Sequence, residues 1–586
     1  MVPPLGIIGN CNTLALSSEG SIEWLCWPRP DSSFVFGPLL DREKGGAFTV
    51  EGLGIDEIRH EYLENTNVLR TVFQGATGSF ELIDFAPRFN LYDRVYKPAM
   101  LVRILRPLSG NPRVRVACRP VYDYGRIVAE AWRSSNHIEF TGLGTPLRLT
   151  TNISLSYVED ERSFLLDRDV HMALTWGDPL EAGLEETAER FLERTIGHWR
   201  EWIKRTRVPR DYQREVIRAA LVLKLHQYED TGALLAATTT SLPEHPSSGR
   251  TWDYRYCWLR DSYFTLNAFE RLGHATEMER FLVYLRNLAE EQGGALQAVY
   301  TIAGGEDVEE TELTHLSGFQ GEKPVRIGNQ AFRHPQNDVY GEMILAVSRL
   351  VLDARFLGSI ATPQAIELVS SLLDQIDSRL EEPDAGPWEL RGIKKVHSFT
   401  LLMHWAGARR AVEIGEVLNE DALVQRGAAI AARAAELLET RCWSEELGAI
   451  TQAAGEPELD ASLLLSLNLG FLPRGDPRAE SHVLATQKAL RADGGLLRRY
   501  NVTDDFGVTK AAFTVCSFWL VEALASIGHR EEAEALFDKL LSLDNGLGLY
   551  SEDLLPDSLE QSGNFPQTYS HVGLINAAFS LSRGWE

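Results

Sequence analysis

Residues 250–261 pack aromatic and charged side chains closely together, in the order RTWDYRYCWLRD. An aromatic face binds the apolar face of a sugar ring, and arginine and aspartate supply hydrogen-bond donors and acceptors for the ring hydroxyls. A buried knot of aromatic rings and ion pairs would have the same composition. The segment therefore indicates either a sugar-binding site or a structural cluster.

A second candidate segment is the loop GPWELRG at residues 386–392. Glu389 directly follows Trp388, and an apolar neighbour raises the pKa of a carboxyl, as a general acid requires near neutral pH. Arg391 would lower that pKa if its side chain pointed inward. The alternative is an exposed glutamate paired with Arg391, and this segment alone does not decide between the two.

The third segment, residues 550–571, holds several acidic side chains. Glu552, Asp553 and Glu560 are all candidate general bases, and their spacing does not choose between them. Hydrolysis of a glycosidic bond needs two carboxyl groups, one to protonate the leaving oxygen and one to activate water, and in an inverting enzyme they lie roughly 6.5–9.5 Å apart. Glu389 with one of these three side chains would meet that need.

Other signals are weaker. Arg499, between Arg498 and Tyr500, is a candidate pocket residue. His397 and His404 lie near Glu389 without a matching carboxylate pattern, so we expect no metal site there. The sequence has no phosphate-binding glycine loop, no HExxH and no GxSxG. Because two carboxyl groups suffice for both proton transfers, we expect no cofactor.

The charge balance excludes several classes of partner. The formal net charge is −25, with a sequence pI near 5.1. Such a surface repels phosphate backbones and anionic membranes, whereas a small neutral oligosaccharide suffers no comparable repulsion. We therefore expect a sugar substrate, no nucleic-acid partner and no membrane partner.

No secretory signal and no apolar stretch of the ~20 residues that span a bilayer is visible, so we expect a cytoplasmic protein. The oligomeric state is not readable.

The N-terminal part of the chain has the periodicity of strands. Residues 68–73 contain β-branched residues with partial alternation, residues 101–106 mix apolar and basic positions at short range, and residues 153–157 alternate between apolar and polar. Short predicted strands separated by Gly, Pro, Asn and Asp favour an antiparallel β-sandwich, which we assign to residues 1–181.

The rest of the chain has the periodicity of helices. Residues 182–210 are rich in Glu, Arg, Leu and Ala and predict a helical linker. From residue 211 to residue 586 the apolar stripes follow a helical period, as at Ile217, Leu221 and Leu225. Paired helices that close into a toroid would place their loops, and with them the functional residues, at one end.

Taken together, these segments resemble glycoside hydrolase family 15, which contains glucoamylases, glucodextranases and bacterial trehalases. The resemblance covers nearly the whole chain: residues 6–10 and 20–28 look like the opening of the N-terminal β-domain, and residues 252–261, the Trp388-Glu389 pair and residues 563–567 follow in family order. It implies a multidomain, mainly α protein in which an N-terminal antiparallel β-sandwich precedes an (α/α)6 barrel.

The resemblance also assigns roles to single residues. Glu389 matches the general acid, Glu552 matches the general base, and Glu560 matches a second acidic position that is not the base. The matching substrate-binding positions, which would hold the terminal glucose, are Tyr254, Trp258, Arg260, Asp261, Trp388 and Arg499.

The function that the resemblance implies is exo-acting hydrolysis with inversion, releasing β-glucose from the non-reducing end of a maltooligosaccharide or an isomalto-type sugar. A trehalase is the alternative within the same family. A non-catalytic sugar-binding regulatory protein on the same scaffold is a second alternative. Thr400-Leu401 stands where many bacterial members have Ser-Lys, and Ser551-Glu552-Asp553 replaces the commoner paired glutamates. These departures concern the substrate more than the reaction.

Overall fold

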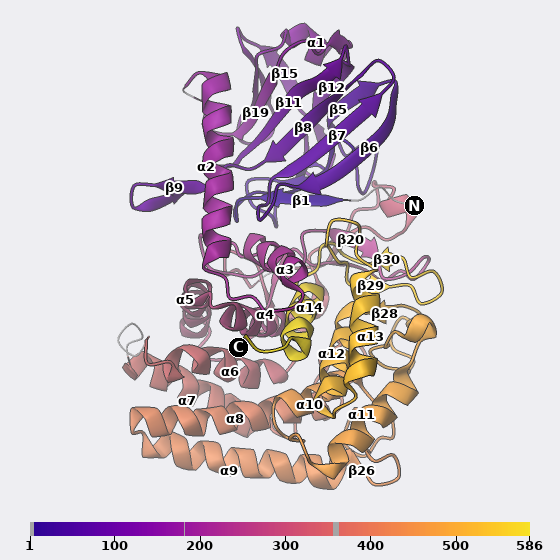
Figure 1. Ribbon diagram of the computed structural model, residues 1–586. Coiled ribbons are helices and arrows are strands. Elements are labelled where there is room, and N and C mark those ends of the chain that lie inside the picture. The colour runs from indigo at the N-terminus through magenta and orange to yellow at the C-terminus, as the bar shows by residue number, and fades with distance from the viewer. Residues whose placement is uncertain (1–4, 181, 307, 356–361, 586) are drawn as a thin grey trace. The chain divides into compact units, whose positions relative to one another are not determined.

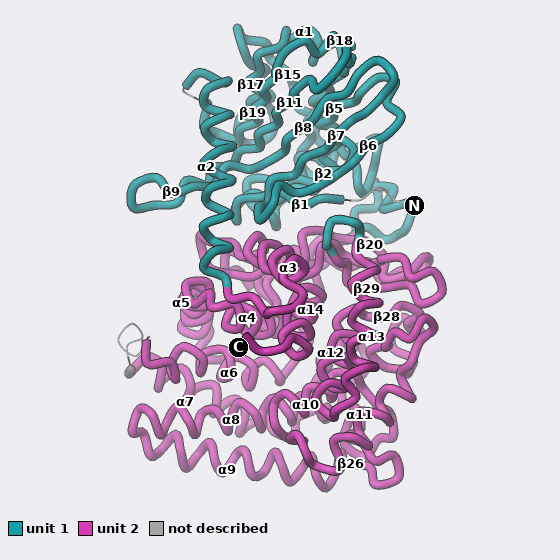
Figure 2. Tube along the Cα trace, viewed as in Figure 1, with its two compact units in different colours: residues 1–206, 312–325, 545–549 teal, residues 207–311, 326–544, 550–586 magenta. Residues whose placement is uncertain are grey.

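The computed structural model describes residues 5–180, 182–306, 308–355 and 362–585 (Figure 1). The chain forms two compact units (Figure 2). Unit 1 comprises the residues up to 206 together with the segments 312–325 and 545–549, and unit 2 comprises 207–311, 326–544 and 550–586. Two short segments from the helical part of the sequence thus belong to the β-rich unit, although no feature of the sequence distinguishes them.

Unit 1 is an antiparallel β-sandwich, as the sequence predicts. One sheet has the strand order β1-β2-β3-β5-β12-β18, with β4 paired to β3. Its strands are β1 Gly6–Gly9, β2 Leu14–Ser18, β3 Ser21–Cys26, β4 Phe34–Phe36, β5 Ala47–Leu53, β12 Arg113–Arg119 and β18 Phe164–Leu165. The other sheet has the order β15-β16-β17-β19-β11-β8-β7-β6. Its strands are β6 Ile55–Tyr62, β7 Leu69–Gly75, β8 Gly78–Phe85, β11 Met100–Gly110, β15 Glu130–Arg133, β16 His137–Thr141, β17 Leu147–Thr151 and β19 Val170–Trp176.

The core of unit 1 follows from alternation along these strands. On β7, Leu69, Thr71 and Phe73 are buried while the intervening residues are less so, and Phe73 stacks on Phe80 with ring centroids 4.5 Å apart. The long helix α2, Leu184–Lys204, packs its apolar stripe, including Phe191, on the second sheet. This helix occupies most of the predicted linker.

The predicted strand at residues 153–157 is wrong. The structure has a short helix there, α1, Leu155–Glu159. Leu155 and Val158 are its buried residues, and they lie three apart, on one face of a helix. Over five residues, an alternating pattern does not distinguish this helical face from a strand.

Unit 2 is an (α/α)6 barrel, also as predicted. Its helices are α3 Gln213–Leu225, α4 Leu259–Leu272, α5 Ala275–Glu291, α6 Asp338–Leu352, α7 Thr362–Arg379, α8 Ser398–Leu418, α9 Asp421–Leu437, α10 Leu465–Asn468, α11 Pro477–Leu490, α12 Thr514–Ser526, α13 Arg530–Leu541 and α14 Thr568–Leu581. An inner ring is formed by the helices α4, α6, α8, α10, α12 and α14 (Figure 1). Between α8 and α12, the short 3-10 helix η4, Ala461–Leu464, contacts both helices. The ring is closed by the contact of α14 with α4. The remaining helices form the outer layer.

Hydrophobic composition decides which helices lie inside the ring. Nearly all of α12 is buried, from Thr514 to Leu524, whereas α13 in the outer layer buries a single stripe that includes Phe537. A helix that is apolar on all sides must be enclosed by other helices, while an amphipathic helix covers them. None of the helices within the described ranges is both long enough and apolar enough to cross a bilayer.

The inner helices also bring the candidate segments together. Residues 252–258 directly precede α4, the loop with Glu389 precedes α8, Arg499 lies in the segment before α12, and Glu552 lies in the segment before α14. Residues from all four segments line one cavity, so segments from distant parts of the sequence meet there.

Two glycines let α6 and α8 pack unusually closely. A Cβ atom on Gly341 would lie 2.1 Å from the backbone oxygen of Met403, and one on Gly407 would lie 2.7 Å from the Cα of Gly341. Both clashes involve backbone atoms, which a side-chain rotation cannot relieve. The ring therefore requires glycine at this crossing.

We predict that Gly341→Ala lowers the free energy of unfolding of unit 2 by about 1–3 kcal/mol, because overpacking forces the helices apart. Differential scanning calorimetry of the full chain measures this as a lower unfolding temperature. The matched control is Gly197→Ala in α2, where a Cβ has nothing within 4 Å and alanine is the better helix former. Equal unfolding temperatures for the two variants would contradict the close crossing.

Candidate active site

All eight predicted site residues line one cavity in unit 2, here called the main cavity. They are Tyr254, Trp258, Arg260, Asp261, Trp388, Glu389, Arg499 and Glu552. The same cavity is lined by Ala236, Pro387, Phe399, Ser462, Phe513, Trp519, Gln567 and Tyr569. The cavity thus combines aromatic faces with two acidic groups, an Arg-Asp pair and a further arginine.

Glu389 is held inside the main cavity by two donors from the 250–261 segment. The indole Nε1 of Trp258 donates to Glu389 Oε1 at 2.6 Å, and Arg260 Nη2 donates to the same oxygen at 3.1 Å. The side chain of Glu389 is 22% exposed. Arg391 does not contact it and instead pairs with Glu310 at 2.6 Å. The alternative of an exposed glutamate paired with Arg391 is therefore wrong.

The loop that carries Glu389 is strained and firmly anchored. Glu389 has a backbone φ of +60°, a left-handed conformation that is unfavourable for a residue with a Cβ. The carboxylate of Asp384 fixes the loop by accepting from the backbone N–H of Asn337 at 2.8 Å, the backbone N–H of Gly386 at 3.1 Å and the hydroxyl of Thr400 at 2.9 Å. Thr400, which departs from the family pattern, thus ties the loop to the first turn of α8.

The surroundings of Glu389 favour its protonated form. Burial raises the pKa of this carboxyl above its ordinary value, and the negative charge of Asp338 raises it further. The guanidinium of Arg260 and the hydrogen bond from Trp258 oppose this rise but do not cancel it. A carboxyl that keeps its proton near neutral pH can act as a general acid.

Geometry distinguishes the three candidate bases that spacing could not. Glu552 lines the main cavity, whereas Asp553 and Glu560 do not, and Glu560 is exposed on the surface. The hydroxyl of Tyr254 donates to Glu552 Oε1 at 2.8 Å. The backbone N–H of Glu552 donates to Asn564 O at 3.0 Å, which fixes the segment against the loop before α14.

Glu552 and Asp553 are adjacent buried carboxyls with different partners. Burial raises the pKa of both carboxyls, and for Asp553 the charge of Glu552 raises it further. Neither oxygen of Asp553 has a hydrogen-bond partner among the described residues, while Glu552 has Tyr254 as a donor and the positive charge of Arg499 nearby. Of the two carboxyls, Glu552 is therefore the one whose partners favour the ionised form, against burial that raises its pKa to about 8.

Arg260 and Asp261 begin the inner helix α4. Asp261 is 8% exposed, and burial raises its pKa to about 7. Arg260 reaches past the cavity wall and donates to Gln336 at 2.7 Å and to Asp338 at 2.9 Å. The pair thus presents one acidic and one basic group to the cavity, as hydrogen-bonding to sugar hydroxyls requires.

An aromatic wall encloses the other side of the main cavity. Trp388 donates from Nε1 to Asp460 Oδ2 at 2.7 Å, which fixes its ring. The ring lies 5.8 Å from Phe513 and 6.3 Å from Trp519, measured between centroids. The guanidinium of Arg499 lies 5.4 Å from the centroid of Phe513. Phe513, directly before α12, and Trp519, within it, were not singled out in the sequence, because apolar residues around an inner helix look like core.

A second cavity, here called the adjoining cavity, shares Tyr254, Trp388, Glu389 and Arg499 with the first. Its further lining residues are Glu244, Arg250, Trp252, Asn329, Ala331, His334, Leu390, Arg391, Tyr500, Asp504, Asp505 and Phe506. Both cavities are lined by Glu389, the predicted acid, and by Trp388. A substrate bond that lies beside Glu389 would therefore have one cavity on each side.

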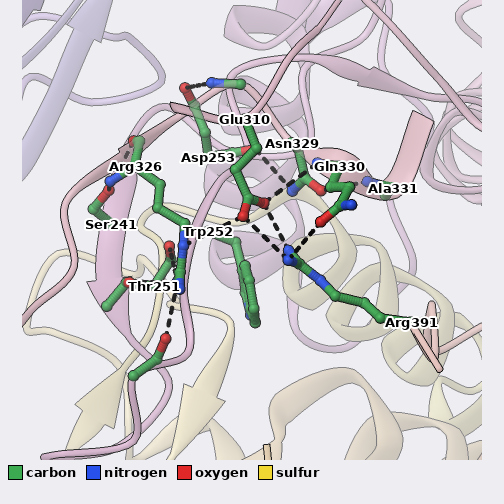
Figure 3. A network of polar contacts seen from close by, with 12 residues as sticks. Ser241, Thr251, Trp252, Asp253, Glu310, Arg326, Asn329, Gln330, Ala331 and Arg391 are labelled. Carbon is green, nitrogen blue, oxygen red and sulfur yellow. Dashed lines mark hydrogen bonds and ion pairs between the residues drawn. The ribbon is translucent and has the colours of Figure 1, made fainter. Parts of the chain in front are cut away.

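Trp252 in the wall of the adjoining cavity lies between two guanidinium groups (Figure 3). The guanidinium carbons of Arg326 and Arg391 lie 4.8 and 4.6 Å from its ring centroid. Figure 3 shows how Glu310 and Gln330 hold Arg391, the latter accepting from it at 3.0 Å. Cation–π contacts of this kind fix a ring in place.

Glu244 is a site residue that the sequence did not indicate. It accepts from Trp252 Nε1 at 3.1 Å and from Arg499, and its charge contributes to the raised pKa of Glu552. It lies in a loop of ordinary composition, LPEHPSSG at residues 242–249, so no local signal could have found it.

The histidines near Glu389 are structural. His404 contacts Asn337 O through Nε2 at 2.8 Å, and burial lowers the pKa of both His397 and His404 to about 4. Within the ranges that the structure describes, no three or more His, Cys, Asp or Glu side chains are grouped so as to hold a metal ion.

Comparison with known proteins decides the family. Residues 210–579 match the glycosyl hydrolases family 15, and residues 2–163 match the family described as trehalase-like, N-terminal. The chain belongs to glycosyl hydrolases family 15. It is a glycoside hydrolase whose family resemblance was visible in the sequence.

Similar proteins include two that are named trehalase. The one from Mycolicibacterium smegmatis is 36% identical, with 100% of this chain and 92% of that protein covered, and the one from Mycobacterium tuberculosis is 35% identical, with 98% and 88% covered. A solved bacterial glucoamylase complexed with acarbose superposes with a TM-score of 0.71 at 14% identity, over 98% of this chain and 93% of that one. The last likeness concerns the fold.

We predict that Gly563→Ala greatly weakens the hydrolase activity. At this glycine, whose φ is +79°, a Cβ would lie 2.9 Å from both Cβ and Oε2 of Glu552 and would push that carboxyl aside. Small displacements of a reacting group cost about 10²-fold in rate, which steady-state kinetics would measure.

The matched control is Gly495→Ala, which has a similar φ of +74° but nothing within 4 Å of the added Cβ. Both variants carry the backbone strain, and only the first carries the clash. If both lose activity alike, strain rather than displacement of Glu552 explains the loss.

Proposed function

We propose that this chain is a trehalase that hydrolyses α,α-trehalose with inversion, with Glu389 as general acid and Glu552 as general base. The observation that carries the proposal is the similarity over nearly the whole chain to the two mycobacterial proteins named trehalase. It supports trehalose over maltooligosaccharides and isomalto-type sugars, the substrates that the sequence resemblance put first.

The arrangement of the main cavity suits this reaction. Asp261 and Arg260 bind the hydroxyls of one glucose ring among the aromatic faces of the cavity. Glu389 gives its proton to the bridging oxygen, while Glu552 takes a proton from a water that attacks the anomeric carbon from the opposite face. The attacked ring leaves as β-glucose and the other ring as α-glucose, and one water is consumed.

Tyr254 supports the base in this scheme. Burial raises the pKa of its hydroxyl well above 10, so the group stays neutral and donates its hydrogen bond to Glu552. This bond stabilises the carboxylate form that the reaction uses. The same hydroxyl orients the carboxylate toward the main cavity.

The adjoining cavity would hold the second glucose. Its wall contains the fixed Trp252 ring and charged groups such as Arg250, Asp504 and Asp505. Arg250 pairs with Asp504, and Tyr500 donates to the same carboxylate. An enclosure with charged donors and acceptors recognises a short polar sugar, because each hydroxyl that finds no partner weakens binding.

The substrate assay is a comparison of kcat/KM for trehalose, maltose, isomaltose and panose. We expect trehalose to be preferred by at least about 10²-fold, since sites with polar partners reject mismatched sugars strongly. Proton NMR at early times would show α- and β-glucose in equal amounts. A preference for maltose or isomaltose would show that the substrate is a maltooligosaccharide or an isomalto-type sugar instead. Release of α-glucose alone would show that the reaction does not invert the anomeric carbon.

The predicted acid and base are tested by single isosteric changes. We expect Glu389→Gln to lower kcat about 10²–10⁴-fold, which is the usual contribution of general acid catalysis. Glu552→Gln should nearly abolish hydrolysis while calorimetric titration still detects trehalose binding. The matched control is Glu560→Gln, because Glu560 is exposed and outside the main cavity, and we expect it to leave kcat unchanged.

The same variants address the reading as a non-catalytic sugar-binding regulatory protein. If the unmodified chain binds trehalose but does not cleave it, that alternative is correct. If Glu389→Gln lowers kcat only a few-fold, Glu389 is not the general acid. If Glu552→Gln binds trehalose weakly but turns it over at the normal rate, Glu552 is not the general base.

A further inference from the structure

Two buried carboxyl groups lie behind the main cavity and have no part in the reaction described above. Asp338 and Glu342 are four residues apart on α6 and hence on one face of that helix. Both are 0% exposed, and neither lines the main or the adjoining cavity. Carboxyl groups enclosed to this degree are rare unless a partner compensates them.

Arg260 connects this pair to the predicted acid. Its Nη2 donates to Glu389 at 3.1 Å, and its Nη1 donates to Asp338 Oδ2 at 2.9 Å. Gln336 accepts from Nη1 as well, at 2.7 Å. One guanidinium therefore serves two carboxyl groups, one facing the substrate and one in the core.

The charges of Arg260, Asp338, Glu342 and Glu389 do not balance if every carboxyl is ionised. Arg260 carries one positive charge, and Asp338, Glu342 and Glu389 would together carry three negative charges. Glu342 has no N–H group or cationic side chain hydrogen-bonded to either oxygen among the described residues. Burial raises its pKa well above the ordinary value, and the charge of Asp338 and the hydrogen bond with Asp338 raise it further.

Glu342 is therefore the member of the pair that keeps a proton. Two carboxyls in contact inside a protein cannot both ionise, and the protonated one donates a hydrogen bond to the other. Asp338 has the contact with the guanidinium, so the single negative charge of the pair lies on Asp338.

We propose that Asp338 and Glu342 are positioning residues for Glu389: Asp338 cancels the positive charge of Arg260, and the protonated Glu342 keeps the pair at one negative charge. The inference rests on the proposed role of Glu389 as the general acid. Arg260 can then hold Glu389 in place without drawing the proton off it. If the charge of Asp338 were removed, the same guanidinium would favour ionised Glu389 and so disable the acid.

Other titratable groups also face Asp338 and Glu342, from α4, the loop before α8, α8 and α14. They are Arg260, Asp261 and Tyr263 on α4, Asp384 and Glu389 on the loop before α8, His397 at the end of that loop, His404 on α8 and Tyr569 on α14. Burial raises the pKa of Tyr263 above its ordinary value, so this group stays neutral. Burial lowers the pKa of the two histidines to about 4 and raises that of Tyr569 well above its ordinary value, so these three stay neutral throughout the neutral pH range.

Asp261 and Asp384 are the neighbours that titrate near neutral pH. Burial raises the pKa of each to about 7, and the charge of Asp338 contributes to the rise for Asp384. Both residues are kept in every variant below. The contribution of Asp261 is thus common to all the profiles, whereas the pKa of Asp384 would itself fall in Asp338→Asn, so the band assigned to Glu389 in the infrared readout below is what attributes the shift to Glu389.

The kinetic test is the pH dependence of kcat/KM for trehalose in the unmodified chain, Asp338→Asn and Glu342→Gln. An acid with a raised pKa is active below that pKa and loses activity as the pH rises through it. In Asp338→Asn, the new amide still accepts a hydrogen bond from Arg260 but carries no charge, so we expect the basic limb to move to lower pH by about one unit or more. At a fixed pH on that limb, this shift is about a tenfold loss per unit.

Glu342→Gln is the matched control within the pair. Glutamine donates to Asp338 as a protonated glutamate does and has the same charge, so we expect both limbs of its profile to stay where they are. An unmoved basic limb in Asp338→Asn would overturn the proposal. A shift in Glu342→Gln as large as that in Asp338→Asn would also overturn it, because Glu342 would then be ionised in the native protein. A loss that is equal at every pH would show a merely structural role.

A second readout needs no catalysis. Infrared spectroscopy distinguishes protonated from ionised carboxyls, and we expect the unmodified chain at neutral pH to show protonated bands that disappear in Glu342→Gln and in Glu389→Gln respectively. In Asp338→Asn, the Glu389 band should disappear at a lower pH than in the unmodified chain. If no glucoside is cleaved, the proposed function fails, and the spectra still decide this inference. Absence of the Glu342 band in the unmodified chain would overturn it.

Discussion

The proposed reaction depends on keeping two carboxyl groups in one enclosed cavity in opposite protonation states. Burial raises the pKa of Glu389 and raises that of Glu552 to about 8, so at Glu552 it opposes the ionised form that a base needs. The partners of each carboxyl are what can separate the two. Glu552 has Tyr254 and Arg499, both of which stabilise the ionised form. Glu389 has Arg260, whose charge is shared with a carboxylate in the core. The two ends of the cavity thus differ in charge balance more than in degree of burial.

Much of this arrangement could be predicted from the sequence. The change from strand to helical periodicity separates the β-sandwich from the barrel, and clusters such as WDYRYCWLRD and PWE bring together aromatic and ionisable residues that ordinary surface loops do not combine. The cavity gathers all eight residues that these clusters and the family resemblance nominated. Periodicity and local composition are short-range signals, and they sufficed because the site residues lie in segments before, or at the start of, the inner helices α4, α8, α12 and α14.

Long-range packing is what the sequence could not reveal. Glu244 reaches Arg499 from a loop without distinctive composition, across 255 residues of chain. Phe513 and Trp519 could not be distinguished from core residues in the sequence, because each side chain is buried in the core and also lines the cavity. Membership of 312–325 in the β-rich unit depends on contacts that local composition does not encode. The strand expected at 153–157 failed because five residues sample less than two turns of a helix.

The close crossing of α6 and α8 has a consequence for the width of the ring. With Gly341 and Gly407 in backbone contact, the two helices cannot come closer at this point, and any larger side chain at either position would force them apart. The crossing therefore fixes how narrow the ring can become, and with it the spacing of the loops that precede α6 and α8.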